Sequence, residues 1–175
     1  MHNKKNKYKR QSSFWLHLKI CGCYRIKRGK FTDIYGDISF NTEAGRRLRI
    51  PASVNFHGQV RITQTKKLSP NITFVNEFHV LPLAIRAIDI HKASHLRIPK
   101  STRFMSDVFL NTFHGRWPES IHTIKGYFFL TYSYIRELNL FSVYGDINLS
   151  GSNIKKCLHE LEVKGDIIIP GIKIR

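Results

Sequence analysis

The first residues to consider for chemistry are the three cysteines among the 175 residues of this chain. Cys21 and Cys23 are too close together for an ordinary disulfide framework, and Cys157 is distant in the sequence. An odd number of cysteines favours free thiols in a reducing compartment. The run Cys21-Gly22-Cys23, with His17 nearby, also lacks the spacing of a zinc site. We therefore expect neither a disulfide framework nor a metal site.

Histidine and aspartate are the next candidates for catalytic groups. His91 and His95 stand four residues apart, a spacing that would align them on a helix. We predict no helix there, and no acidic residue lies between them. Asp37, Asp146 and Asp166 recur beside a glycine, which we interpret as a column of repeat residues that serves turns. The chain shows no nucleophile motif or glycine-rich phosphate loop. The sequence predicts a protein that is not an enzyme and has no cofactor.

A third group of residues could bind a partner rather than react with a substrate. Its members are aromatic, imidazole or guanidinium side chains: Arg61, His79, Phe109, Tyr127 and Phe129. Exposed aromatic clusters commonly mark binding surfaces. Whether these five residues lie together depends on the elements that position them.

A sequence repeat could provide that positioning. Val143–Leu149 (VYGDINL) recurs as Val163–Ile169 (VKGDIII) and, less closely, as Ile124–Leu130 (IKGYFFL). With the glycine as position 0, seven anchors carry apolar residues at −2, +2 and +4, and we call this pattern the template. The anchors, 18 to 30 residues apart, are Gly36, Gly58, Asn76, Ser106, Gly126, Gly145 and Gly165. A period of about 20 residues is typical of a repeat architecture.

Apolar residues two positions apart indicate a strand with one buried face. The three apolar columns are Ile34, Phe56, Phe74, Phe104, Ile124, Val143 and Val163 at −2; Ile38, Val60, Phe78, Val108, Phe128, Ile147 and Ile167 at +2; and Phe40, Ile62, Val80, Leu110, Leu130, Leu149 and Ile169 at +4. Prolines in several connecting segments disfavour helices there. We expect a mainly β, right-handed solenoid of about seven to eight short turns, with one curved parallel sheet and little helix in the returns.

The C-terminal repeats connect this pattern to a known family. Trp117–Ile121 forms a proline-containing turn that leads into Ile124–Gly126, and Gly145–Leu149 leads into a Ser/Asn-rich turn that ends at Ile154. This arrangement resembles the short leucine-rich repeats of bacteria, of roughly 20 residues each, with Ile, Val and Phe in place of Leu. The resemblance covers residues 31–175 and is closest from Trp117 onward. A different parallel β-solenoid is the alternative fold.

The resemblance implies a function as an interaction module. In bacteria, short repeats of this kind often occur in proteins that are delivered into host cells. We therefore expect a non-enzymatic repeat protein that mediates protein–protein interaction, although a fold does not by itself fix a function.

The face opposite the core is the expected contact surface. If positions −2, +2 and +4 point inward, then +1 and +3 point outward. Phe109 and Phe129 should then stack on adjacent strands with Tyr127 beside them, while Arg61 and His79 share their face. We call these five residues the outward patch. The alternatives are that the N-terminal segment or a return loop covers the rings, or that a register error of one residue reverses the assignment.

The net charge of +17 is concentrated near the N-terminus. Residues 1–30 hold ten basic residues and no acidic one, so we divide the chain into a basic tail and capping segment (1–30) and a repeat domain (31–175). Residues 1–10 should be disordered because they are polar and repel one another. Phe14–Tyr24 should cap the first repeat, as solenoids require. A membrane-surface anchor is the alternative for this segment.

Localisation and further partners follow from the same composition. His17 and Lys19 interrupt the apolar run Phe14–Ile20, so we expect neither a cleavable signal peptide nor a transmembrane segment. The compartment is unknown, and the cysteines favour a reducing, intracellular one. Residues 1–30, together with the outward face, could instead bind nucleic acid, and residues 1–30 could bind an anionic membrane. The apolar C-terminal edge could mediate self-association.

Overall fold

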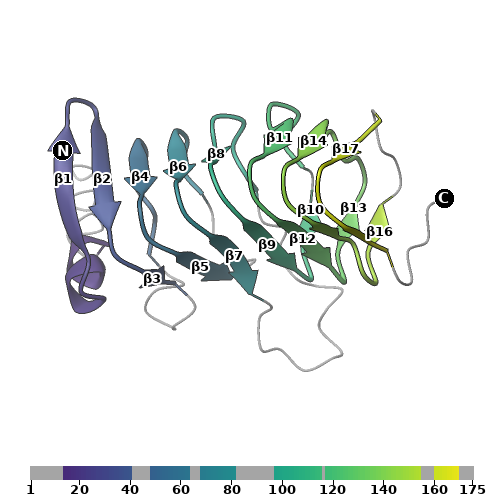
Figure 1. Ribbon diagram of the computed structural model, residues 1–175. Coiled ribbons are helices and arrows are strands. Elements are labelled where there is room, and N and C mark those ends of the chain that lie inside the picture. Colours follow the sequence, from purple (N-terminus) through teal and green to yellow (C-terminus); the bar gives the residue numbers. More distant parts are fainter. Residues whose placement is uncertain are drawn as a thin grey trace, which may run out of the picture.

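The chain forms stacked β-coils, seen from the side in Figure 1. The computed structural model describes residues 14–40, 48–63, 68–81, 97–115, 117–154 and 160–169. The expectations for His91, His95, Cys157 and the tail at 1–10 lie outside these residues. Within these residues the fold is mainly β with one helix, and the coils form a β-solenoid of about 5 turns. In Figure 1 the colours run along the stack in sequence order, so each coil lies beside its neighbours in the chain.

The largest sheet contains the +2 column of the template. Its seven strands are parallel and lie in the order β18-β15-β12-β9-β7-β5-β3. Their bounds are Ile38–Ser39 (β3), Val60–Thr63 (β5), Phe78–Leu81 (β7), Val108–Asn111 (β9), Phe128–Thr131 (β12), Ile147–Asn148 (β15) and Ile167–Ile168 (β18). Each anchor contributes one strand, so equivalent residues of successive coils lie side by side.

The −2 column lies in two further sheets. A five-stranded sheet has the order β1-β2-β4-β6-β8, with only β1 and β2 antiparallel, and a three-stranded parallel sheet has the order β11-β14-β17. Their bounds are Tyr24–Arg28 (β1), Phe31–Tyr35 (β2), Val54–Phe56 (β4), Ile72–Phe74 (β6), Arg103–Phe104 (β8), Thr123–Ile124 (β11), Ser142–Val143 (β14) and Glu162–Val163 (β17).

A fourth sheet lies in the C-terminal half. It contains three short parallel strands in the order β10-β13-β16, namely His114–Gly115, Tyr134–Ile135 and Asn153–Ile154. Its first strand follows β9 after a two-residue bend, so these coils turn again shortly after the large sheet. The connections between coils that the structure describes are extended or bent rather than helical.

The expectation of one curved sheet is wrong, because each expected strand is split at position 0 of the template. The chain bends there, and the two halves join different sheets. At Gly36 the bend uses a φ of 104°, a conformation open to glycine. At Gly58, a Cβ would lie 2.2 Å from the carbonyl oxygen of Gly36 in the neighbouring coil. The coils therefore touch backbone to backbone at this corner.

The number of turns is also lower than the seven to eight expected, at about 5. One reason lies at the end of the stack. The last template copy, Val163–Ile169, contributes β17 and β18 but completes no turn within the described residues. Counting template copies therefore overestimates the number of turns.

The core lies between the sheets and confirms the predicted register. All eighteen residues at −2, +2 and +4 of the first six anchors are 8% exposed or less. Phe74 stacks on Phe56 and Phe104 of the adjacent coils, at centroid distances of 5.6 and 5.4 Å. The last copy departs from the prediction, because Ile167 and Ile169 are 55% and 44% exposed. Among the described residues, no further coil covers them.

The described part of the N-terminal segment begins with a helix over residues 14–20. Phe14 and Leu18, four residues apart on one helix face, are buried. The Phe14 ring stacks on Phe40 of the first coil at 6.0 Å, and His17 Nε2 lies 3.0 Å from the carbonyl oxygen of Ser39. The helix therefore covers the start of the core, while the division of the chain at residue 30 stays a prediction.

Candidate binding surface

Four of the five outward-patch residues lie in one row across the seven-stranded sheet. They occupy position +3 of the template on β5, β7, β9 and β12. The parallel register places Arg61 beside His79, His79 beside Phe109, and Phe109 beside Phe129. Equivalent residues of parallel neighbours lie about 4.8 Å apart, which is ring-stacking distance. The repeat therefore aligns residues that are far apart in the sequence.

The rings of this row stack on one another. His79 and Phe109 have centroids 4.4 Å apart with an interplanar angle of 8°, and Phe109 and Phe129 have centroids 5.0 Å apart at 11°. Tyr127, at position +1, lies beside the row, 6.0 Å from Phe129, and is 44% exposed. Stacking leaves Phe109 and Phe129 half-buried even though they point away from the core. The structure thus brings the predicted aromatic residues together, and their role in binding stays a prediction.

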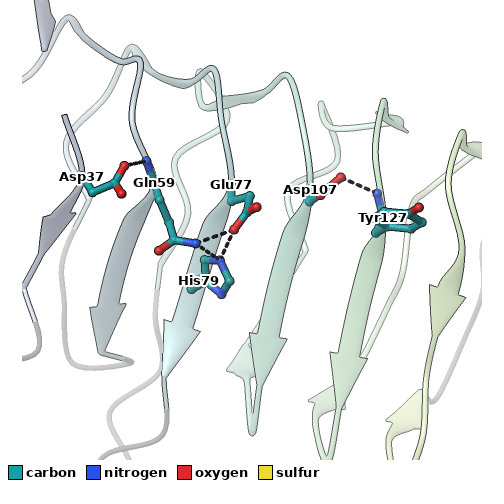
Figure 2. Close-up of polar contacts among 6 residues, drawn as sticks. All are labelled: Asp37, Gln59, Glu77, His79, Asp107 and Tyr127. Carbon is teal, nitrogen blue, oxygen red and sulfur yellow. Dashed lines mark hydrogen bonds and ion pairs between the residues drawn. The ribbon is translucent and has the colours of Figure 1, made fainter. Parts of the chain in front are cut away.

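A polar network holds the imidazole end of the row in place (Figure 2). The Gln59 amide donates a hydrogen bond to the Glu77 carboxylate and lies 3.0 Å from His79 Nε2, and His79 Nε2 lies 2.9 Å from Glu77 Oε2. Hydrogen bonds from His79 first, and then from Gln59, lower the pKa of Glu77 below its ordinary value. Sequence reasoning placed Gln59 and Glu77 on this face but did not include them in the patch.

Glu77 should make the stability of the protein depend on pH. Because the folded-state pKa of Glu77 is lowered, its ionised form stabilises the fold above the unfolded-state pKa, and this contribution is lost as the pH falls through the folded-state value. We expect Glu77→Gln to reduce the free energy of unfolding at neutral pH. The difference from wild type should shrink below about pH 4. Denaturant unfolding across a pH series measures this difference.

The matched control for this prediction is the same substitution in a His79→Ala background. His79 is the largest cause of the lowered pKa, so the pH-dependent part of the difference should be smaller there. Equal pH dependence in both backgrounds would contradict the assigned cause.

Carboxylates at position +1 connect neighbouring coils. Asp37 Oδ1 accepts the backbone N–H of Gln59 at 2.8 Å, and Asp107 Oδ1 accepts that of Tyr127 at 2.8 Å (Figure 2). In the same way, Asp146 accepts the N–H of Asp166 at 2.9 Å. The side chain of one coil thereby satisfies a backbone donor of the next coil, which is a structural use of the aspartate column.

The charge of this face is acidic, opposite in sign to the chain as a whole. Positions +1 and +3 contribute one guanidinium, that of Arg61. They contribute five carboxylates: Asp37, Glu77, Asp107, Asp146 and Asp166. A polyanion approaching the rings would meet like charge, whereas a cationic group would be attracted. The face therefore favours an apolar or cationic ligand.

A second ring stack, on the five-stranded sheet, was missed by sequence reasoning. Tyr24 stacks on Tyr35 at 5.0 Å, and Tyr35 stacks on His57 at 4.4 Å. The buried Asp33 carboxylate contacts His57 Nε2 at 3.2 Å and accepts a hydrogen bond from Asn55 at 2.8 Å. The sequence did carry a signal for this stack, because position −1 of the template holds Tyr35 and His57 in two successive copies.

The described residues contain no group of three or more His, Cys, Asp or Glu side chains that could hold a metal ion. Cys21 and Cys23 are both free thiols, and burial raises the pKa of Cys23 to about 11. A thiol with this pKa stays protonated at neutral pH and is a poor nucleophile.

Comparisons with known proteins give no relative. Neither protein-family models nor curated proteins nor solved structures match this chain. In the part of the chain that the structure describes, no helix has the length and apolar character to cross a bilayer.

Proposed function

We propose that this protein binds another protein through the outward patch and performs no catalysis. The observation that supports this proposal is the continuous stack of His79, Phe109 and Phe129, with Tyr127 exposed beside it. Stacked rings on adjacent strands are held in place by the sheet, so little conformational entropy is lost when a partner binds. Aromatic residues are also the residue types that contribute most to protein interfaces.

The chemistry of the surrounding face defines the partner further. Five carboxylates at position +1 share this face with the rings, and that of Glu77 contacts the His79 imidazole. A partner segment carrying Lys or Arg beside apolar side chains would place its cation near the carboxylates and over the rings. We therefore propose a partner with a basic and apolar contact segment.

The test is affinity capture with immobilised full-length protein from nuclease-treated extract, followed by titration with each captured protein. Phe109→Ala/Tyr127→Ala/Phe129→Ala should weaken binding of the true partner by at least about tenfold, because aromatic hot spots each contribute on the order of 2 kcal/mol. Salt should weaken binding only modestly, because it screens the pairs between the partner's cations and the carboxylates but leaves the apolar contact with the rings.

The matched control replaces three exposed aromatic residues outside the patch: Tyr132→Ala/Phe141→Ala/Tyr144→Ala. This variant should retain the same partners at wild-type affinity. If both triple variants bound every captured protein equally well, the outward patch would not be the contact surface.

Nucleic-acid binding is the second candidate, because Arg61 neighbours a row of rings on which bases could stack. The acidic column at position +1 disfavours it on this face. If it is the true function, affinity for single-stranded RNA should fall steeply with salt. It should also fall when the basic residues at 1–10 are replaced with glutamine, and when the three aromatic residues of the outward patch are replaced with alanine.

We further propose that the solenoid is right-handed and of the leucine-rich-repeat type. We also propose that the protein is delivered into host cells, as this resemblance implies. The proposal rests on the proline-containing turn at Trp117–Ile121 and the glycine-aspartate strands that follow it. An experimental structure with left-handed coils would refute the fold assignment. A secretion assay in the native bacterium would test delivery.

A further inference from the structure

The exposed face of the N-terminal helix carries two aliphatic side chains. Phe14 and Leu18 face the core, whereas Leu16 and Ile20 are 59% and 75% exposed. At about 100° per residue, Leu16, Lys19 and Ile20 share one sector of the helix, opposite Phe14. Two large apolar residues, with a lysine beside them, thus point away from the solenoid.

The surroundings of this helix face are cationic. Every residue of β1 is exposed, and this strand contributes Arg25, Lys27 and Arg28. The Arg25 guanidinium lies 4.3 Å from the centroid of the Trp15 ring, which places β1 against the helix. The sequence contains no acidic residue before Asp33, whose carboxylate pairs with Arg28 at 2.9 Å. We call Leu16, Lys19, Ile20, Arg25 and Lys27 the N-terminal surface.

We propose that the N-terminal surface docks on an anionic lipid bilayer. Leu16 and Ile20 enter the boundary between headgroups and acyl chains, while Lys19 and Lys27 lie at the level of the lipid phosphates. Aliphatic side chains of an amphipathic helix bind at this depth, and basic residues beside them add attraction to anionic lipids.

The side chains of this surface distinguish a bilayer from a nucleic acid. Both ligands attract cations, but proteins that bind single-stranded nucleic acid place aromatic rings against the bases. Leu16 and Ile20 cannot stack on a base, whereas a bilayer accepts them. The outward patch has the opposite character, aromatic and acidic, so membrane docking and protein binding use separate surfaces.

The test is co-sedimentation of the full-length protein with vesicles of phosphatidylcholine, with and without phosphatidylserine. We expect binding only to vesicles that contain phosphatidylserine, and weaker binding as salt is raised. Leu16→Ser/Ile20→Ser should reduce partitioning by about tenfold or more, because it removes the apolar insertion. Lys19→Gln/Lys27→Gln should reduce it by about tenfold or more as well, since each cation contributes on the order of fivefold.

Matched controls separate this surface from general charge and from the outward patch. Lys100→Gln/Lys125→Gln removes the same charge from exposed positions elsewhere and should leave vesicle binding unchanged. Phe109→Ala/Phe129→Ala should also bind vesicles normally. Circular dichroism should show the folded state in the Leu16→Ser/Ile20→Ser and Lys19→Gln/Lys27→Gln variants, because the substituted side chains are exposed.

Three results would overturn the proposal. The first is no binding to phosphatidylserine vesicles. The second is vesicle binding that Leu16→Ser/Ile20→Ser leaves unchanged, which would show adsorption by charge alone. The third is salt-sensitive binding to single-stranded RNA in the absence of vesicle binding, which would assign the cations to a nucleic acid. None of these results bears on protein binding through the outward patch.

Discussion

Gly58→Ala is expected to lower the free energy of unfolding by about 3 kcal/mol, the upper end of the range for overpacking a close contact. The added Cβ would lie 2.2 Å from the carbonyl oxygen of Gly36 and 2.8 Å from the backbone nitrogen of Asp37. Both atoms belong to the backbone of the adjacent coil, so no change of side-chain rotamer relieves the contact. The two coils would have to separate at their corner, where the five- and seven-stranded sheets meet. Denaturant unfolding measures the loss.

The control for this prediction is a glycine outside the stack. Gly29 has a φ of 58°, and a Cβ added to it would meet no atom within 4 Å. Gly29→Asn should therefore cost less than about 1 kcal/mol, because asparagine tolerates this left-handed conformation. If the two substitutions had equal effects, close approach of the coils would not be the reason for glycine at position 58.

Phe74→Ala is expected to destabilise the protein by about 3 to 5 kcal/mol, the usual range for a phenylalanine removed from a core. The Phe74 ring is fully buried and lies 5.6, 4.3 and 5.4 Å from the ring centroids of Phe56, Phe78 and Phe104. Its removal leaves a cavity that involves three successive coils. Because each coil of a solenoid is stabilised mainly by its neighbours, the damage affects both sides of the gap.

Two companion variants define what Phe74 contributes. Phe74→Leu keeps most of the volume and should recover a large part of the stability, since volume-conserving apolar substitutions cost less than truncation. Phe141→Ala, at an exposed phenylalanine, should have a small effect. A Phe74→Ala variant that unfolded within about 1 kcal/mol of wild type would contradict a shared phenylalanine core.

The sequence was sufficient to predict the buried columns of the first six template copies and the outward face. Both depend on an alternation that the seven template copies repeat, and the alternation determines which side of each strand is buried. Phe128 and Ile147 are buried as predicted, and Phe109 stacks on Phe129 as predicted. An error in a single copy would have changed little, because neighbouring copies constrain one another.

The bend at position 0 could not be predicted from the same pattern. Of the seven anchors only Gly58 is buried, and Gly36 and Asn76 are exposed. The apolar columns on either side of position 0 nevertheless keep an even spacing of four residues, so the pattern of apolar residues does not change at the corner. Hydrophobic periodicity therefore cannot distinguish one long strand from two strands that meet at an angle. The close backbone contact at Gly58 became evident only with the adjacent coil in place.

The polar network at the patch was also beyond sequence reasoning. Gln59, Glu77 and His79 were expected on one face, but their contacts depend on side-chain conformations across β5 and β7. The N-terminal helix was expected as a cap without an assigned secondary structure. Phe14 and Leu18 have helical spacing, but the seven residues 14–20 are too few for a periodic pattern to be recognised.

The aspartate column gives the stack a direction. Asp37, Asp107 and Asp146 each accept an N–H from the coil that follows in the sequence. In each of these hydrogen bonds the acceptor lies on the coil that comes earlier in the sequence, and the donor lies on the coil that comes later. Duplication of the coil that carries Asp146 would lengthen the sheet by one strand, about 4.8 Å, and would add one more carboxylate able to accept an N–H from the coil that follows it. The row of outward side chains at position +3 would then grow by one residue with each added coil.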